Sequence, residues 1–278
     1  MRRIFWLALV LLLAGCASDE GIVDHSEYRV DTRYPALNAW PRVRVLVIHY
    51  TAGDFERSLT TLRGRNVSAH YLIARQPEQR HGRPLVYQLV PEEKLAWHAG
   101  QSYWRGATRI NDTSVGIELE NHGWYRTATG RHFEPFDKAQ IAALIPLARD
   151  IVQRYGIAPE NVVAHSDVAP QRKDDPGPLF PWRELAQAGI GAWPDADRVA
   201  FYLGDRHPTQ PVDQTALLNL LNRYGYEVDR DMTPARQRRV IRAFQMHFRP
   251  DRYDGHADAE TQAIAEALLE KYGTGYSH

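Results

Sequence analysis

The stretch RVRVLVIHYT, residues 42–51, alternates between charged and apolar residues and then becomes continuously apolar. A strand that enters a buried sheet has this pattern, because both of its faces pack against other elements. Further strand candidates of similar composition lie at residues 68–74, 84–90, 113–121 and 161–165. The sequence therefore predicts a central sheet, with His49 close to the end of its first buried strand.

Between the last two predicted strands, apolar residues recur at positions i, i+3 and i+4 from Ile141 to Tyr155, which predicts a helix. Asp137 and Gln140 have the spacing of a capping box at its start. Pro146 lies inside the stripe and predicts a kink or an interrupted hydrogen-bond ladder. Strands mixed with helices indicate an α/β domain, which we place at residues 41–193.

The composition changes after Trp193. Residues 194–212 are loop-like and predict a linker, and three short helical patterns follow them. Their apolar residues are Leu217, Leu218, Leu221 and Tyr224, then Val240, Ile241, Phe244 and Phe248, then Ile264, Leu268 and Leu269. Thr233 with Pro234, and Asp258, have the residue types expected at the starts of the second and third helices. We therefore predict a small three-helix domain at residues 213–276.

The N-terminus resembles a bacterial lipoprotein signal. Arg2 and Arg3 precede an apolar run at residues 4–13, which ends in LAGC with Cys16, the single cysteine of the chain. The resemblance implies that residues 1–15 are removed, that Cys16 carries the lipid and that residues 16–40 form a tether. Ala17 is not the Asp typical of inner-membrane retention, so the expected location is the outer membrane, on its periplasmic face. The alternative is an ordinary secretory signal that contains a cysteine.

The composition narrows the classes of partner. Hydrophobic residues make up 44% of the chain and charged residues 24%, with a formal net charge of zero. Lysine and arginine are scattered without a long basic run, so the sequence argues against nucleic-acid binding. With its only cysteine at the lipid position, the mature chain has no thiol for catalysis or for a disulfide. We expect a monomer.

The segment VVAHSDVAPQRKDDPGP, residues 162–178, carries the polar groups with the clearest chemistry. His165 follows a strand, and Asp175 lies in a loop that also contains Pro176 and Pro178. With His49, these residues would supply two imidazoles and one carboxylate, a ligand set of catalytic zinc that leaves one position for water. Alternatively, each histidine is a structural residue at a strand end, and the aspartates and prolines form ordinary turns.

Five motifs occur together and in order between about residues 42 and 185. They are VIHYT at His49, SAHYLI at His70, LAWHAG at residues 95–100, NDTSVGIELEN at residues 111–121 and AHSDVAPQRKDDPGP at residues 164–178. Their combination resembles the zinc-dependent N-acetylmuramoyl-L-alanine amidases of the Amidase_2 family, whose fold is shared with peptidoglycan recognition proteins. The resemblance implies a central mixed β-sheet flanked by helices and one Zn²⁺ per chain, held by His49, His165 and Asp175.

The resemblance also implies the reaction and its residues. It assigns catalysis to Glu118 and Lys173, and the substrate bond to the amide between N-acetylmuramic or anhydromuramic acid and L-alanine. Alternation in SVGIELE puts Glu118 and Glu120 on one face, so the residues alone do not choose between them, and the motif selects Glu118. For Lys173, an ion pair with Asp174 or Asp175 is the alternative role.

Weaker expectations concern substrate contacts and the C-terminal domain. Trp97 and His98 are expected to line the substrate groove, and His70 to be structural. YGY, AFQ and DGHADAET in the last segment resemble a peptidoglycan-binding domain, for which a generic stabilising role is the alternative. Signal, amidase domain and C-terminal domain together resemble an outer-membrane lipoprotein branch of the family that acts on peptidoglycan and muropeptides. The competing function is a non-catalytic peptidoglycan recognition protein, which would generally lack the full ligand set.

Overall fold

The structure is a computed structural model that describes residues 20–128 and 130–273, and the chain divides into two compact units, Met1–Trp40 and Pro41–His278. In the first unit, β1 (Ile22–Asp24) and β2 (Arg29–Asp31) pair as a short antiparallel hairpin. The predicted signal and Cys16 lie outside the described residues. Within the described ranges, no helix has the length and apolarity needed to cross a membrane.

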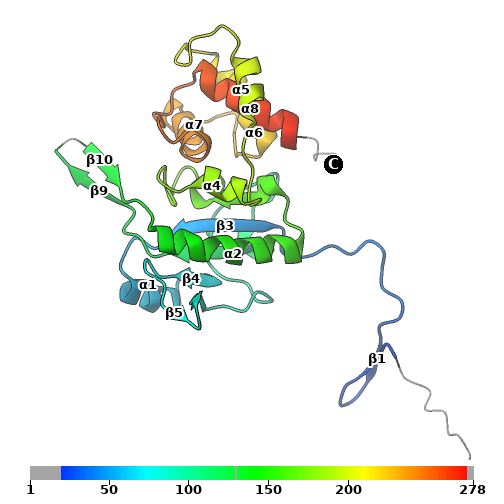
Figure 1. Ribbon diagram of the computed structural model, residues 1–278. Helices are drawn as coiled ribbons and strands as arrows, with labels where there is room; N and C mark the ends of the chain where they lie inside the picture. Colours follow the sequence, from blue (N-terminus) through cyan, green and yellow to red (C-terminus); the bar gives the residue numbers. More distant parts are fainter. Residues whose placement is uncertain (1–19, 129, 274–278) are drawn as a thin grey trace, which may run out of the picture. The chain divides into compact units, whose positions relative to one another are not determined.

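The second unit is built on a five-stranded sheet with the strand order β11-β3-β8-β4-β7. The strands are β3 (Val45–Tyr50), β4 (Tyr71–Ile73), β7 (Tyr87–Gln88), β8 (Ser114–Leu119) and β11 (Val162–Ala164). Four of them are parallel, and β7 pairs antiparallel with β4. The prediction of a mixed central sheet is therefore confirmed, although the strands predicted at residues 68–74 and 84–90 are shorter than expected (Figure 1).

The remaining elements of this α/β part are short, apart from one long helix. They are α1 (Phe55–Leu62), β5 (Gln79–Arg80), β6 (Arg83–Pro84), η1 (Ile110–Thr113), β9 (Trp124–Thr127), β10 (Gly130–Phe133), α2 (Lys138–Tyr155), η2 (Pro159–Asn161), α3 (His165–Val168) and α4 (Trp182–Gln187). Helix α2 covers one face of the sheet (Figure 1), and Leu46 and Ile48 belong to the same buried cluster as Ile141 and Leu144.

The long helix confirms one half of the predicted cap. The Asp137 side chain accepts a hydrogen bond from the backbone N–H of Ala139. The capping-box role of Gln140 was wrong, because its amide instead donates to the carbonyls of Ile73 and Glu120 at 3.1 and 3.0 Å. Helix α2 continues through Pro146 and extends from Lys138 to Tyr155.

The C-terminal part contains α5 (Ala196–Leu203), α6 (Gln214–Tyr224), α7 (Pro234–Phe248) and α8 (Ala259–Tyr272). Thr233 and Asp258 cap α7 and α8 as predicted, each accepting from a backbone N–H of the first turn. Helix α5 lies where an irregular linker was expected, because Ala196–Leu203 also has an amphipathic pattern that pairs it with α8.

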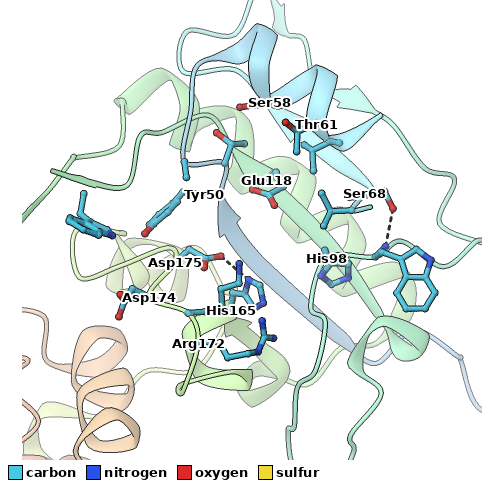
Figure 2. A pocket seen from close by; sticks show the side chains of 17 residues that line it. Tyr50, Ser58, Thr61, Ser68, His98, Glu118, His165, Arg172, Asp174 and Asp175 are labelled. Carbon is cyan, nitrogen blue, oxygen red and sulfur yellow. Dashed lines mark hydrogen bonds and ion pairs between the residues drawn. The ribbon is translucent and has the colours of Figure 1, made fainter. Parts of the chain in front are cut away.

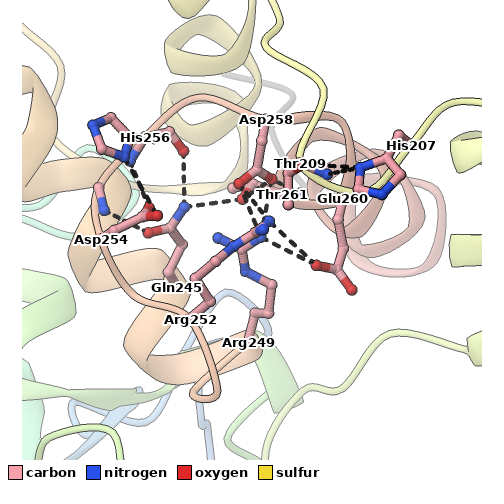
Figure 3. A network of polar contacts seen from close by, with 11 residues as sticks. His207, Thr209, Gln245, Arg249, Arg252, Asp254, His256, Asp258, Glu260 and Thr261 are labelled. Atoms are coloured by element: carbon pink, nitrogen blue, oxygen red, sulfur yellow. Dashed lines mark hydrogen bonds and ion pairs between the residues drawn. The ribbon is translucent and has the colours of Figure 1, made fainter.

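A buried polar network fixes the connection from α7 to α8 (Figure 3). Gln245 donates to Thr261 Oγ1 at 3.0 Å and accepts from the N–H of Gly255 at 2.8 Å. Arg249 donates to both oxygens of Asp258 at 3.0 Å. These contacts tie the AFQ and DGHADAET motifs together as structural elements of the helical part.

The C-terminal helices and the sheet share one apolar core. Val45 and Val47, which alternate with the residues that face α2, belong to the same buried cluster as Tyr226 and Phe244. A buried carboxylate adds a polar connection, because Asp167 accepts from Tyr226 Oη at 2.6 Å and pairs with His247 Nδ1 at 2.7 Å. The helical part therefore packs as an integral layer against the α/β part.

Candidate metal centre

Two of the predicted site residues lie on neighbouring strands. His49 on β3 and Glu118 on β8 are paired directly in the parallel register. Paired side chains of adjacent strands point to the same face of a sheet, and both residues lie near the carboxyl ends of their strands. The sheet thus brings a histidine and a glutamate together at the carboxyl ends of two neighbouring strands, although the two residues are far apart in the sequence.

The segment after β11 adds His165 and Asp175. His165 begins α3. The backbone N–H of Ser166 donates to the carbonyl of Asp175 at 2.9 Å, and this hydrogen bond holds the Asp175 loop against the start of α3. His49 Nδ1 lies 2.9 Å from His165 Nδ1 and 3.1 Å from Asp175 Oδ2, and His165 Nδ1 lies 3.0 Å from that oxygen. All three side chains are buried, and Figure 2 shows His165 and Asp175 side by side.

The LAWHAG loop holds the other ring nitrogen of each histidine. His165 Nε2 lies 3.1 Å from the carbonyl oxygen of Ala99, so this nitrogen carries the hydrogen. His49 Nε2 lies 3.0 Å from Nδ1 of His98. Asn111 fixes the loop itself, because its Oδ1 accepts from the backbone N–H groups of His98 and Ala99 at 3.1 and 2.8 Å.

A chain of hydrogen bonds sets the direction of the contact between His49 and His98. The Ser114 hydroxyl donates to the carbonyl of Ile110 at 2.6 Å, and its oxygen lies 3.0 Å from His98 Nε2. His98 Nε2–H must therefore donate to Ser114, which leaves His98 Nδ1 as an acceptor for His49 Nε2–H. The unprotonated Nδ1 of a neutral His49 then faces His165 and Asp175.

The backbone of β8 makes room for His98. A Cβ atom at Gly116 would lie 2.5 Å from Cγ of the His98 ring. That distance is far below van der Waals contact, so any side chain at position 116 would displace the imidazole. The glycine of the SVGIELE motif is thus explained by the close approach of His98.

The three converging atoms fit a divalent cation. Two neutral imidazole nitrogens and one carboxylate oxygen face one another with no hydrogen between them, which is the donor set of catalytic zinc sites. Burial, with a smaller contribution from His165, lowers the pKa of His49 to about 4, so the ring is neutral as a ligand must be. Burial would raise the pKa of Asp175, but His165 and His49 outweigh that effect and hold it well below its usual range.

Glu118 lies beside this group with an unsatisfied oxygen. Its Oε2 is buried and has no hydrogen-bond partner among the described residues. Burial, with a smaller contribution from the charge of Asp175, raises the pKa of Glu118 to about 8, and Lys173 opposes the shift. Glu120, the neighbouring glutamate, instead accepts from the backbone N–H of Arg75 at 2.7 Å. The two glutamates that the alternation left equivalent therefore have different environments.

Glu118, His165 and Asp175 line a cavity of about 350 Å³, which we call the catalytic cavity (Figure 2). Lys173 lines this cavity and makes no ion pair within the described ranges. Asp174, a possible partner of Lys173, pairs with Arg131 and Arg242 instead. Trp97 lies at the wall with 61% of its surface exposed. His98 is buried, and both of its ring nitrogens are used within the protein.

Sequence reasoning did not identify the supporting residues. Ala99 and Ser114 act through a backbone carbonyl and a small hydroxyl, for which spacing gives no signal. The polar segment 162–178 gave no signal that Asp167 is fully buried. The position of His98 inside LAWHAG was the one available signal, and it did not distinguish substrate contact from support of a ligand.

The fold and the site define a class of enzyme. A family model described as N-acetylmuramoyl-L-alanine amidase matches residues 39–178, so the chain belongs to that family and the resemblance seen in the motifs is confirmed. AmiD of Escherichia coli is 67% identical over 274 residues, which cover 98% of this chain and 99% of AmiD.

Solved structures agree with this assignment. A complex of E. coli AmiD with the substrate anhydro-N-acetylmuramic acid-L-Ala-D-γ-Glu-L-Lys has a TM-score of 0.90 and 66% identity, and covers 92% of this chain and 99% of that one. AmpDh3 from Pseudomonas aeruginosa has a TM-score of 0.76 and 43% identity, with 90% and 98% of the two chains covered. Both likenesses extend over the α/β part and the C-terminal helices.

Proposed function

We propose that this chain is a zinc-dependent N-acetylmuramoyl-L-alanine amidase that hydrolyses the amide between N-acetylmuramic or anhydromuramic acid and L-alanine. The observation that carries the proposal is the buried group of His49 Nδ1, His165 Nδ1 and Asp175 Oδ2 with Glu118 beside it. Membership of the amidase family supplies the reaction, and the complex of AmiD with an anhydromuramyl peptide supports the substrate.

The residues would divide the work as follows. His49, His165 and Asp175 would hold the zinc ion, which supplies Lewis acidity toward water and the amide carbonyl. Glu118 would accept the proton of the attacking water and pass it to the leaving amine of L-alanine. Glu118 lines the cavity, and its Oε2 has no competing hydrogen bond among the described residues. Lys173 would stabilise negative charge on the carbonyl oxygen as it develops.

Trp97 and His98 would shape the substrate groove. The exposed face of Trp97 suits stacking against a sugar ring, because aromatic rings offer a broad apolar surface. His98 would contribute through its ring carbons at the cavity wall and through its hydrogen bond to His49. The C-terminal helices would bind peptidoglycan, as their AFQ and DGHADAET motifs suggest.

Cys16 would carry the lipid that anchors the chain to the outer membrane, with the enzyme on the periplasmic face. The support is the signal-like N-terminus and the high identity to AmiD along almost the whole chain. A Cys16→Ser variant should appear in the soluble periplasmic fraction, and its retention in the outer membrane would contradict the anchor.

The test of the reaction combines metal content and product mass. The mature protein should contain one zinc per chain and release L-alanyl peptides from anhydromuramyl tripeptide, as measured by mass spectrometry. Removal of the metal with a chelator should abolish release, and added zinc should restore it. Glu118→Gln should keep the zinc but lose at least about a hundredfold in kcat. Undiminished cleavage without metal would overturn the mechanism, and binding without cleavage would indicate a recognition protein.

A further inference from the structure

A second cavity of about 280 Å³ adjoins the catalytic cavity. The two cavities share Arg172, Lys173 and Asp174 in their walls, so they are neighbouring parts of one surface depression. The α/β part contributes Arg131 from β10 and the loop before Asp175. The C-terminal part contributes Arg239 and Arg242 from α7. We call this second cavity the seam pocket, because both parts of the chain line it.

The seam pocket is strongly cationic. Its charged lining residues are Arg131, Arg172, Lys173, Arg239 and Arg242 against the single carboxylate of Asp174. Asp174 is shared, because Arg131 approaches it at 2.7 Å and Arg242 at 2.8 Å. The surplus of positive charge therefore remains after every ion pair of the lining is counted.

Three of the cations have no carboxylate partner in the described part of the chain. Arg172 donates to the carbonyl oxygens of Ala99 and Gln101 at 2.9 and 2.5 Å, which leaves its charge uncompensated. Lys173 and Arg239 make no ion pair there, and Arg239 is exposed. Nε of Arg131 is buried and has no hydrogen-bond partner among the described residues. The pocket thus holds uncompensated positive charge, which is the complement of an anion.

The opposite wall of the catalytic cavity is uncharged. It consists of Ser58, Thr61, Leu62, Val67, Ser68 and Trp97. Figure 2 shows Ser58 and Thr61 across the cavity from Asp174 and Arg172. A substrate that lies in the cavity therefore meets neutral and aromatic groups at one end and cations at the other.

We propose that the seam pocket is a subsite for the carboxylates of the stem peptide, while the neutral sugar lies toward Trp97. The inference rests on the proposed amidase function and adds the direction of the substrate and its charged contacts. The anhydromuramyl peptide seen with AmiD contains a γ-linked glutamate, whose α-carboxylate is free in such a linkage. By this proposal, α7 of the C-terminal part contacts the same small substrate that the metal centre cleaves.

Arg239→Gln is the sharpest test, because Arg239 pairs with no carboxylate in the described ranges and its loss should not disturb Asp174. Arg238→Gln is the matched control, since Arg238 lies next to it on α7, outside the seam pocket, and donates to His256 Nε2 at 3.3 Å. Each variant would be assayed on anhydromuramyl tripeptide and on the same peptide with its carboxylates converted to amides, with KM and kcat measured separately.

We expect Arg239→Gln to raise KM for the carboxylate substrate about fivefold with little change in kcat. It should leave KM for the amidated substrate unchanged, and Arg238→Gln should leave both substrates unchanged. Equal behaviour of the two variants on both substrates would overturn the subsite. The wild-type chain serves to separate the two proposals, because failure of that enzyme to cleave either substrate would refute the amidase function instead.

Discussion

Nδ1 of His98 lies 3.0 Å from Nε2 of His49, and the Ser114 hydroxyl fixes the direction of this hydrogen bond. His98 is thereby an acceptor that holds His49 in the tautomer with Nδ1 free. Partners of this kind orient a metal ligand and set which nitrogen is available to the ion. His98 is therefore a positioning residue for the metal centre, whatever it contributes to the substrate groove.

The first prediction concerns the affinity for zinc. His98→Leu removes the acceptor and should weaken zinc binding about ten- to a hundredfold, as measured by competition with a chromophoric chelator. His98→Asn places an amide oxygen close to the position of Nδ1 and should retain most of the affinity. Circular dichroism of both variants shows whether they fold. If His98→Asn binds zinc as poorly as a folded His98→Leu, the acceptor role is wrong.

Each of the proposed metal ligands lies in a local pattern that the sequence shows. His49 ends an apolar run that can only be a buried strand, and the parallel register then brings it beside Glu118. His165 and Asp175 lie in one short segment whose backbone returns on itself through Ser166. Strand ends and turn residues are visible in the sequence, and the family resemblance then selected His49, His165 and Asp175 from among them.

The supporting contacts depend on packing between distant segments, which no local pattern reveals. The choice between Glu118 and Glu120 needed the burial of one carboxyl group and the backbone contact of the other. The partners of Asp167 lie more than fifty residues later in the sequence, at Tyr226 just after α6 and at His247 on α7. Such pairs follow from the way two layers pack, and only the folded chain shows them.

The second prediction concerns the pH dependence of stability in the metal-free protein. The pKa of Glu118 is about 8 in the fold and 4.5 as its ordinary value, so between these values the unfolded chain binds fewer protons. Burial lowers the pKa of His49, His70 and His98 in the fold, so protonation of these residues in the unfolded chain opposes this trend below about pH 7. The free energy of unfolding should therefore fall as pH rises from 7 to 9. Glu118→Gln removes the titrating group and should flatten this decline, as thermal unfolding at several pH values would show.

Glu120→Gln is the matched control for that experiment. It removes a carboxyl group from the same face of the same strand region, but Glu120 keeps a backbone partner at Arg75. Its decline in melting temperature between pH 7 and 9 should resemble that of the wild type. A decline of wild-type size in Glu118→Gln would show that another group titrates in this range.

The third prediction concerns the connection between the C-terminal helices and the metal centre. Asp167 is fully buried, and besides Tyr226 and His247 it accepts from the backbone N–H of Ala164 at 2.8 Å, directly before His165. Tyr226→Phe removes one donor and leaves a buried carboxylate oxygen unpaired, which should cost about 1–3 kcal/mol. For a chain of this size, that cost corresponds to a melting temperature lowered by about 5 °C.

Tyr224→Phe is the control for this experiment. It separates the loss of the Tyr226 hydrogen bond from the general effect of removing a tyrosine hydroxyl from the same core. Tyr224 is equally buried in the same core, and its hydroxyl makes no hydrogen bond in the part of the chain that the structure describes. If the C-terminal helices brace the His165 turn, Tyr226→Phe should also weaken zinc binding, and Tyr224→Phe should not. Loss of thermal stability in Tyr226→Phe with unchanged zinc affinity would confine Asp167 to holding the two layers together. Equal effects of both substitutions would remove the case for a specific hydrogen bond, because loss of packing alone would then explain them.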